Sequence, residues 1–165
     1  MIHEVAGDIL LTGADAIAHG VAANDPMDQG LAMALHKNYP AMHKDFHHWC
    51  HVQHRKMGDA WAWGGAGGVR IVNLLTQDGG YDRGSRPGKA SVSSVNHALR
   101  SLKKIVVKEK FSSIAIPRLA TGVGGLTWED VSPLIQNQLG DLDADVYVYS
   151  EYLPEKRAKE PGLAP

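Results

Sequence analysis

Apolar and polar residues alternate along this chain in short stretches with two different periods. Apolar runs, many of them β-branched, predict strands at residues 2–5, 14–21, 59–63, 69–76, 112–116 and 146–149. Apolar residues three and four positions apart predict helices at 31–38, 41–56 and 90–110, and a last helix that ends near residue 140. Thr127 is placed to cap this last helix, because Asp130 follows at the third position. Strands that alternate with helices predict an α/β sandwich with helices on both faces of a sheet.

Three loops between these elements have compositions suited to a phosphorylated ligand. They span residues 22–30, 77–88 and 120–125, and each is rich in glycine or in polar turn-forming residues. Glycine lets the backbone approach a phosphate closely, and N–H groups at a helix start bind phosphate oxygens. One glycine-rich turn is often no more than chain geometry. Three such loops together predict a diphosphate site beyond the carboxyl ends of the strands.

Composition narrows the class of protein. The chain has 165 residues, which suits one domain, and we place it at residues 1–153 with a flexible, charged and proline-containing tail at 154–165. The formal net charge is −1 with dispersed basic residues, which argues against duplex nucleic acid as a partner. Cys50 is the single cysteine, so no internal disulfide forms and a reducing compartment is indicated. With no signal-peptide pattern and no apolar run of membrane-spanning length, we expect a cytoplasmic monomer that does not bind a membrane.

Two isolated polar residues are candidates for chemistry. Asp8 follows a glycine near the N-terminus, where a carboxylate could accept a hydrogen bond from the exocyclic amine of a purine. Without further context, the sequence favours an ordinary turn aspartate at this position. His19 ends a predicted buried strand beside the first loop, which suits a general acid or base near a ribose. It could equally be a core histidine satisfied by the backbone.

A group of histidines is the other conspicuous feature. His43, His47, His51 and His54 recur three or four residues apart, so they share one face of the predicted helix. His47 and His51 could share a zinc ion. The chain has no HExxH motif and no paired cysteines, however, so the pattern favours a polar helix face over a metal site.

Six segments, taken in order, resemble the macro domain family. They are GDIL at 7–10, DAIAHGVA at 15–22, QGLAMALHKNYP at 29–40, VNLLTQ at 72–77, IAIPRLATGVGGLTWEDV at 114–131 and VYVYS at 146–150. The chain is most similar to the branch that contains the terminal ADP-ribose protein glycohydrolase and the yeast ADP-ribose-1''-phosphate phosphatase. The resemblance implies a three-layer α/β/α sandwich around a mixed central sheet. It also implies that ADP-ribose or an ADP-ribosylated substrate is the partner.

The resemblance further implies where the ligand lies. Asp8 would read the adenine amine, and Ile9 would offer its backbone to the ring. Gly30 and Leu31 would flank the diphosphate and the distal ribose, opposite the glycine-rich loop. The ligand-binding residues implied in this way are Asp8, Ile9, Gly20, Val21, Gly30, Leu31, Thr76, Gln77, Leu119, Ala120, Thr121, Gly122, Val123, Gly124, Gly125, Leu126, Tyr149 and Ser150.

Catalysis carries over from the family less completely. The glycohydrolase branch uses a lysine just after the strand threonine and an aspartate in the glycine-rich loop, and these positions here hold Gln77 and Gly124. Glutamine cannot attack ribose as an amine nucleophile, and glycine has no side chain. The phosphatase has a histidine that matches His19, so we expect His19 and the loop acid Asp78 to support hydrolysis of ADP-ribose-1''-phosphate or ADP-ribosyl esters. The alternative is a non-catalytic ADP-ribose-binding module, and neither function calls for a cofactor or a metal.

Overall fold

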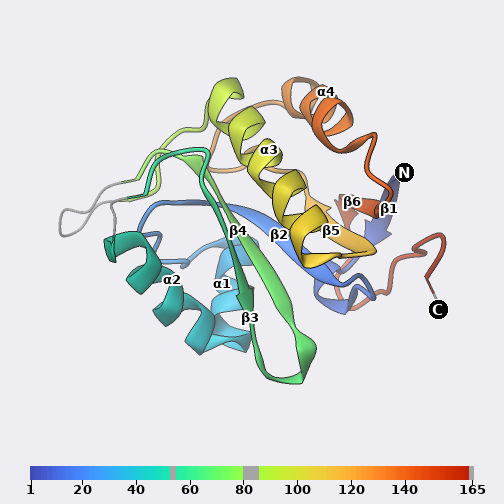
Figure 1. The fold of residues 1–165 in the computed structure, drawn as a ribbon, viewed down its shortest axis with the longest axis horizontal. Helices are drawn as coiled ribbons and strands as arrows, with labels where there is room; N and C mark the ends of the chain where they lie inside the picture. The colour runs from blue at the N-terminus through green and yellow to red at the C-terminus, as the bar shows by residue number, and fades with distance from the viewer. Residues whose placement is uncertain (53–54, 80–85, 164–165) are drawn as a thin grey trace.

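The computed structural model describes residues 1–52, 55–79 and 86–163, and a six-stranded sheet runs through its centre (Figure 1). In chain order the strands are β1 (Ile2–Gly7), β2 (Ala16–Ala22), β3 (Ala60–Gly64), β4 (Arg70–Gln77), β5 (Ser113–Pro117) and β6 (Asp145–Tyr152). Their order across the sheet is β1-β6-β5-β2-β4-β3. All neighbours pair in parallel except β3, which lies antiparallel to β4 at one edge. The five parallel strands therefore end at the same edge of the sheet.

Helices cover both faces of the sheet. They are α1 (Gly30–Asn38), α2 (Pro40–Val52), α3 (Val92–Glu109) and α4 (Trp128–Leu139), with short 3₁₀ turns η1 (Ile9–Leu11) and η2 (Ala66–Gly68). The helices α3 and α4 pack on one face, and α1 and α2 pack on the other. Each face has its own apolar cluster, because alternate residues of a strand point to opposite sides of the sheet. In β4, for example, Leu74 packs toward α3 whereas Leu75 belongs to the cluster with α2.

The predicted α/β fold, a three-layer α/β/α sandwich with a mixed central sheet, is confirmed. The Thr127 cap is also confirmed, because the hydroxyl oxygen accepts the backbone N–H of Asp130 at 3.3 Å. The predicted helix at 41–56 was too long at its C-terminal end. Residues 55–56 are not helical, because the backbone N–H of Lys56 donates to the Asp59 carboxylate in a turn. The last strand was predicted too short and runs on to Tyr152.

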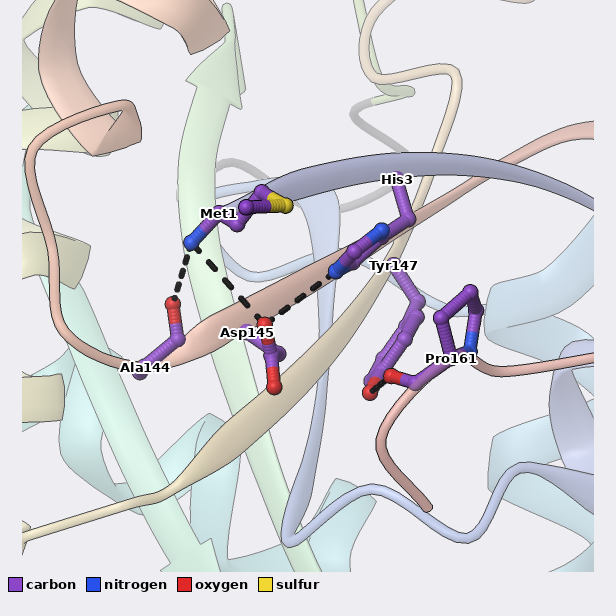
Figure 2. Close-up of polar contacts among 6 residues, drawn as sticks. All are labelled: Met1, His3, Ala144, Asp145, Tyr147 and Pro161. Atoms are coloured by element: carbon purple, nitrogen blue, oxygen red, sulfur yellow. Dashed lines mark hydrogen bonds and ion pairs between the residues drawn. The ribbon is translucent and has the colours of Figure 1, made fainter.

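Residues 154–163, which the sequence predicted to be part of a flexible tail at 154–165, follow Leu153 along the edge of the sheet that β1 and β6 form. The Glu160 carboxylate accepts hydrogen bonds from the backbone N–H of Gly13 and the hydroxyl of Tyr149, both at 2.9 Å. Figure 2 shows the neighbouring contact, in which the Tyr147 hydroxyl donates to the Pro161 carbonyl oxygen. We call residues 153–163 the C-terminal segment.

Across the described ranges, no helix combines the length and the apolar character that a membrane crossing requires.

Candidate functional site

The candidate site lies at the carboxyl edge of the parallel strands. The loops after β1, β2, β4 and β5 all leave the sheet there, together with the end of β6. This edge is the usual ligand position in open α/β sheets, because the connections to the next elements gather around it. Two cavities open here, and Gly30 and Leu31 line both of them.

The larger cavity, of about 510 Å³, lies between the start of α1 and the loop after β5. Ten residues of its lining were predicted from the sequence: His19, Gly20, Gly30, Leu31, Gln77, Leu119, Ala120, Gly122, Val123 and Gly124. Eight were not named individually: Asp25, Asp28, Gln29, Ala32, Arg86, Pro87, Pro117 and Arg118. Five of these eight, Asp25, Asp28, Gln29, Arg86 and Pro87, lie in the loops at 22–30 and 77–88 that the sequence predicted for the diphosphate site. The Arg86 guanidinium lies 2.6 Å from the Asp28 carboxylate, so an ion pair joins two of the loops that line this cavity.

The smaller cavity, of about 310 Å³, lies beside η1. Asp8, Ile9, Gly30 and Leu31 were predicted for the site, and Leu10, Ala34 and Tyr152 complete the lining. The Asp8 carboxylate is held by two backbone N–H groups, of Leu10 on Oδ1 and of Glu155 on Oδ2, each at 3.0 Å. In return, the Asp8 N–H donates to the Lys156 carbonyl oxygen at 2.7 Å. The C-terminal segment thus helps to fix the orientation of this carboxylate.

The remaining predicted residues lie at the site edge without lining either cavity. They are Val21, Thr76, Asp78, Thr121, Gly125, Leu126, Tyr149 and Ser150. Val21 belongs to the fully buried core beneath α2. Asp78 is exposed, and its backbone pairs with Gly88 and Lys89. The Tyr149 hydroxyl is engaged by Glu160, and burial raises the pKa of that phenol.

His19 is buried in the wall of the larger cavity. Its side chain extends from β2 beside Asn73 of β4, and Nε2 lies 2.7 Å from the Asn73 amide oxygen. Because an amide oxygen only accepts, Nε2 carries the proton and Nδ1 keeps a lone pair. Burial lowers the pKa of His19, opposed by the Asn73 bond and the charge of Asp25. The imidazole is therefore neutral at neutral pH and able to accept a proton.

Three buried polar atoms in this region have no hydrogen-bond partner among the described residues. They are Nδ1 of His19, Nδ2 of Asn73 and Oγ1 of Thr76. Buried polar atoms are nearly always paired, so such a group calls for an explanation. Of the three, only His19 lines the larger cavity, so its Nδ1 is the unpaired atom that lies beside the candidate site.

The loop of residues 120–125, which we call the glycine loop, lines the larger cavity with Ala120 and residues 122–124. Its internal bonds use the N–H of Gly125, which donates to Gly122, and the N–H of Leu126, which donates to Ala120, both at 3.0 Å. The N–H groups of residues 122–124 have no partner among the described residues. Because those residues line the cavity just before α4, their amides are available to phosphate oxygens.

The family model described as Macro domain matches residues 18–135 of the chain. The chain belongs to the macro domain family. Its relatives include the DNA ADP-ribosyl glycohydrolase of Mycobacterium tuberculosis, which is 27% identical over 156 residues. That match covers 89% of this chain but 42% of the relative, so the chain spans less than half of the relative's length. The human ADP-ribose glycohydrolase OARD1 is 22% identical over 141 residues, which is 82% of each protein.

Solved macro domains share the fold. The macrodomain of Mycobacterium tuberculosis DarG matches with a TM-score of 0.80 at 24% identity, over 94% of this chain and 99% of that one. Thermosipho africanus DarTG, solved in complex with ADP-ribose, matches with a TM-score of 0.79 at 22% identity, over 94% of this chain and 42% of that one.

Gln77 and Gly124 occupy the two positions at which the sequence comparison with the glycohydrolase branch expects a lysine and an aspartate. Gln77 lines the larger cavity, and its side-chain amide donates to the Gly88 carbonyl oxygen at 3.1 Å. Gly124 has no room for a side chain, because an added Cβ would lie 2.7 Å from the Ala120 carbonyl oxygen. The backbone of the glycine loop therefore excludes an aspartate at Gly124 unless the loop moves.

The structure gives the histidine group a different role from a metal site. Among the described residues, no three His, Cys, Asp or Glu side chains are arranged to hold a metal ion. His54 lies outside the described residues. His43 and His47 both contact the carbonyl oxygen of Asp25, in the loop that follows β2. A local sequence pattern could not reveal these contacts, because the two histidines are 18 and 22 residues from Asp25 along the chain.

Proposed function

We propose that this macro domain binds ADP-ribose across its two adjoining cavities. The adenine ring would occupy the smaller cavity beside Asp8, and the diphosphate and distal ribose would occupy the larger one. The observation that carries this proposal is the shared wall at Gly30 and Leu31. This wall joins the two cavities. The smaller one contains the Asp8 carboxylate, which can accept a hydrogen bond from an amine, and the larger one is lined by the glycine loop, whose amides can bind a diphosphate.

The relatives support the same ligand. A structural neighbour was solved in complex with ADP-ribose, and two curated relatives are named as ADP-ribose or ADP-ribosyl glycohydrolases. The shared element order brings the equivalent loops to the same sheet edge in each fold.

Calorimetric titration with ADP-ribose tests the binding proposal. We expect saturable binding, and Asp8→Ala should weaken it because a charge-assisted hydrogen bond contributes about 1.5–3 kcal/mol. Asp8→Asn keeps one acceptor oxygen for the backbone and serves as the milder comparison. No binding by the wild-type protein, or equal affinity of all three proteins, would contradict the placement of adenine.

We further propose that the site hydrolyses ADP-ribose-1''-phosphate or an ADP-ribosyl ester. Neutral His19 would accept a proton from water as the water attacks phosphorus or the anomeric carbon. The bond to the leaving group breaks as the new bond to oxygen forms, and the amides of the glycine loop stabilise the developing negative charge. The exposure of Asp78 and its place outside both cavity linings make His19 the first choice for proton transfer.

A panel of ADP-ribose derivatives incubated with the protein and read by mass spectrometry separates hydrolysis from binding alone. Hydrolysis predicts released phosphate or free ADP-ribose, and His19→Gln should slow turnover by about 10²–10⁴-fold. Asp78→Ala tests the second acid in the same assay. Recovery of unchanged ligand after saturable binding would favour the non-catalytic module. That alternative is motivated by Gln77 and Gly124, which stand where the glycohydrolase branch has a lysine and an aspartate.

We also propose a cytoplasmic monomer that does not bind duplex nucleic acid or membranes. The net charge of −1 and the single buried cysteine support this assignment. Sedimentation with and without duplex DNA tests it, because a dimer or a DNA-bound species would sediment faster.

A further inference from the structure

The loop of residues 23–29, which we call the aspartate loop, forms one wall of the larger cavity with a strained backbone. Asn24 and Met27 have φ of 56° and 52°, in the left-handed region that non-glycine residues seldom adopt. Asp25, Asp28 and Gln29 of this loop line the cavity. A strained backbone persists only where surrounding contacts hold it in place. The aspartate loop therefore needs contacts that impose its conformation.

One set of contacts comes from the side chain of Asp25, which bonds to the end of β2 and to Met27 of the aspartate loop. The buried Asp25 carboxylate accepts the backbone N–H of Ala22 on Oδ2 at 3.0 Å. It accepts the N–H of Met27 on Oδ1 at 2.8 Å. These bonds fix the N–H groups of Ala22 and Met27 and leave the carbonyl oxygens of Asp25 and Met27 to other partners.

The other set comes from histidines of α1 and α2. Nε2 of His43 and Nε2 of His47 lie 3.1 and 3.3 Å from the Asp25 carbonyl oxygen. Nδ1 of His36 lies 3.2 Å from the Met27 carbonyl oxygen. Because a carbonyl oxygen only accepts, each of these ring nitrogens carries a proton and donates it.

The three rings also support one another. His36 stacks on His43 with centroids 3.9 Å apart, and the centroid of His47 lies 4.4 Å from that of His43. We call His36, His43 and His47 the histidine ladder. A polar helix face that only meets water would not explain this convergence. His48 shows the difference, because it lies on the same helix, is exposed and makes no such contact with the described residues.

We propose that the histidine ladder consists of positioning residues, which hold the aspartate loop in the conformation that binds the ligand. This inference rests on the proposed ADP-ribose site, because the loop wall it fixes continues into Gly30 and Leu31 between the two cavities. The ladder acts through the backbone of the loop and does not touch the cavity itself. The proposed role requires an N–H donor at positions 43 and 47. It does not require the side chains there to gain or lose a proton.

Paired substitutions separate hydrogen-bond donation from side-chain volume. His43→Leu with His47→Leu fills similar space without a donor, whereas His43→Gln with His47→Gln keeps an N–H near each Nε2 position. His48→Leu is the matched control on the same helix. Two measurements apply to every variant: ADP-ribose affinity by calorimetry, and amide hydrogen exchange of residues 22–31 without ligand.

We expect the leucine pair to bind about tenfold more weakly, and to exchange the amides of residues 22–31 faster. The glutamine pair should stay within about threefold of the wild-type affinity, and His48→Leu should match the wild type. If the leucine pair fails to fold, judged by its urea midpoint, His43→Leu alone replaces it.

Two results would overturn the proposal. One is wild-type exchange and affinity in the leucine pair. The other is a glutamine pair as defective as the leucine pair, which would assign the effect to ring packing. If the wild-type protein does not bind ADP-ribose at all, the proposed function fails. The exchange measurement on unliganded protein still decides whether the histidines position the loop.

Discussion

Replacement of Gly124 by alanine tests whether the glycine loop is shaped by a close backbone approach. An added Cβ would lie 2.7 Å from the Ala120 carbonyl oxygen and 3.0 Å from its Cα. Both atoms belong to the backbone, so no side-chain rotation relieves the contact. The loop must move, and this movement strains the bond from the Leu126 N–H to the same Ala120 oxygen, now 3.0 Å long.

The expected cost follows from these contacts. Overpacking of a well-packed region destabilises a protein by about 1–3 kcal/mol, and we expect Gly124→Ala to fall in this range. For a chain of 165 residues, each kcal/mol lowers the melting temperature by about 2–4 °C. Affinity for ADP-ribose should also fall, because residues 122–124 line the larger cavity.

Gly122→Ala is the matched control, two residues away in the same loop. A Cβ added at Gly122 meets no described atom within 4 Å, so the free energy of unfolding should change by less than about 0.5 kcal/mol. Urea denaturation of both variants, with the slope m compared, gives the stability difference. An unchanged midpoint for Gly124→Ala, or an equal loss in both variants, would refute the argument from close approach.

Three further predictions concern other parts of the molecule. Burial lowers the pKa values of His19 and His43, so the folded state binds fewer protons than the unfolded state below about pH 6.5. The urea midpoint should therefore fall from pH 7.5 to pH 5.5, and His43→Gln should reduce this fall; an equal fall in both proteins would contradict the assignment to His43. Glu160→Gln should lower the free energy of unfolding by about 1–3 kcal/mol, because it removes a charged acceptor for Gly13 and Tyr149. No change in the urea midpoint would mean that the C-terminal segment does not dock in solution. The buried thiol of Cys50, whose pKa burial raises, should react with a thiol reagent much more slowly in native than in unfolded protein, and equal rates would show that it is accessible.

Local patterns in the sequence predicted the types and the order of the helices and strands, and the resemblance to macro domains added much of the lining of the larger cavity. The Thr127 cap depends on residues three positions apart, and the strands and helices follow from periods of two and 3.6 residues. The glycine loop could be located because glycines between a strand and a helix mark a close backbone approach. Gly124 has such an approach, whereas Gly122 does not, and only the packing of the loop distinguishes them.

The end of a helix was less predictable than its presence. The polar stretch at 53–56 continues the composition of α2, so the sequence offered no reason to end the helix before residue 56. The Asp59 side chain supplies that reason by taking the Lys56 N–H into a turn. Competition between side-chain and helical hydrogen bonds is a local effect, but its outcome depends on where the following strand lies.

The sequence by itself determined the element types, the resemblance to macro domains, and the presence of loops suited to a diphosphate. The tertiary structure alone decided which groups meet. The N–H of Glu155 reaches the Asp8 carboxylate across 147 positions, and the ring of His43 reaches the Asp25 carbonyl oxygen across 18. The physical reason is the range of the interactions. Periodicity and capping act within one or two turns, whereas the sheet order brings together distant loops whose contacts no local pattern records.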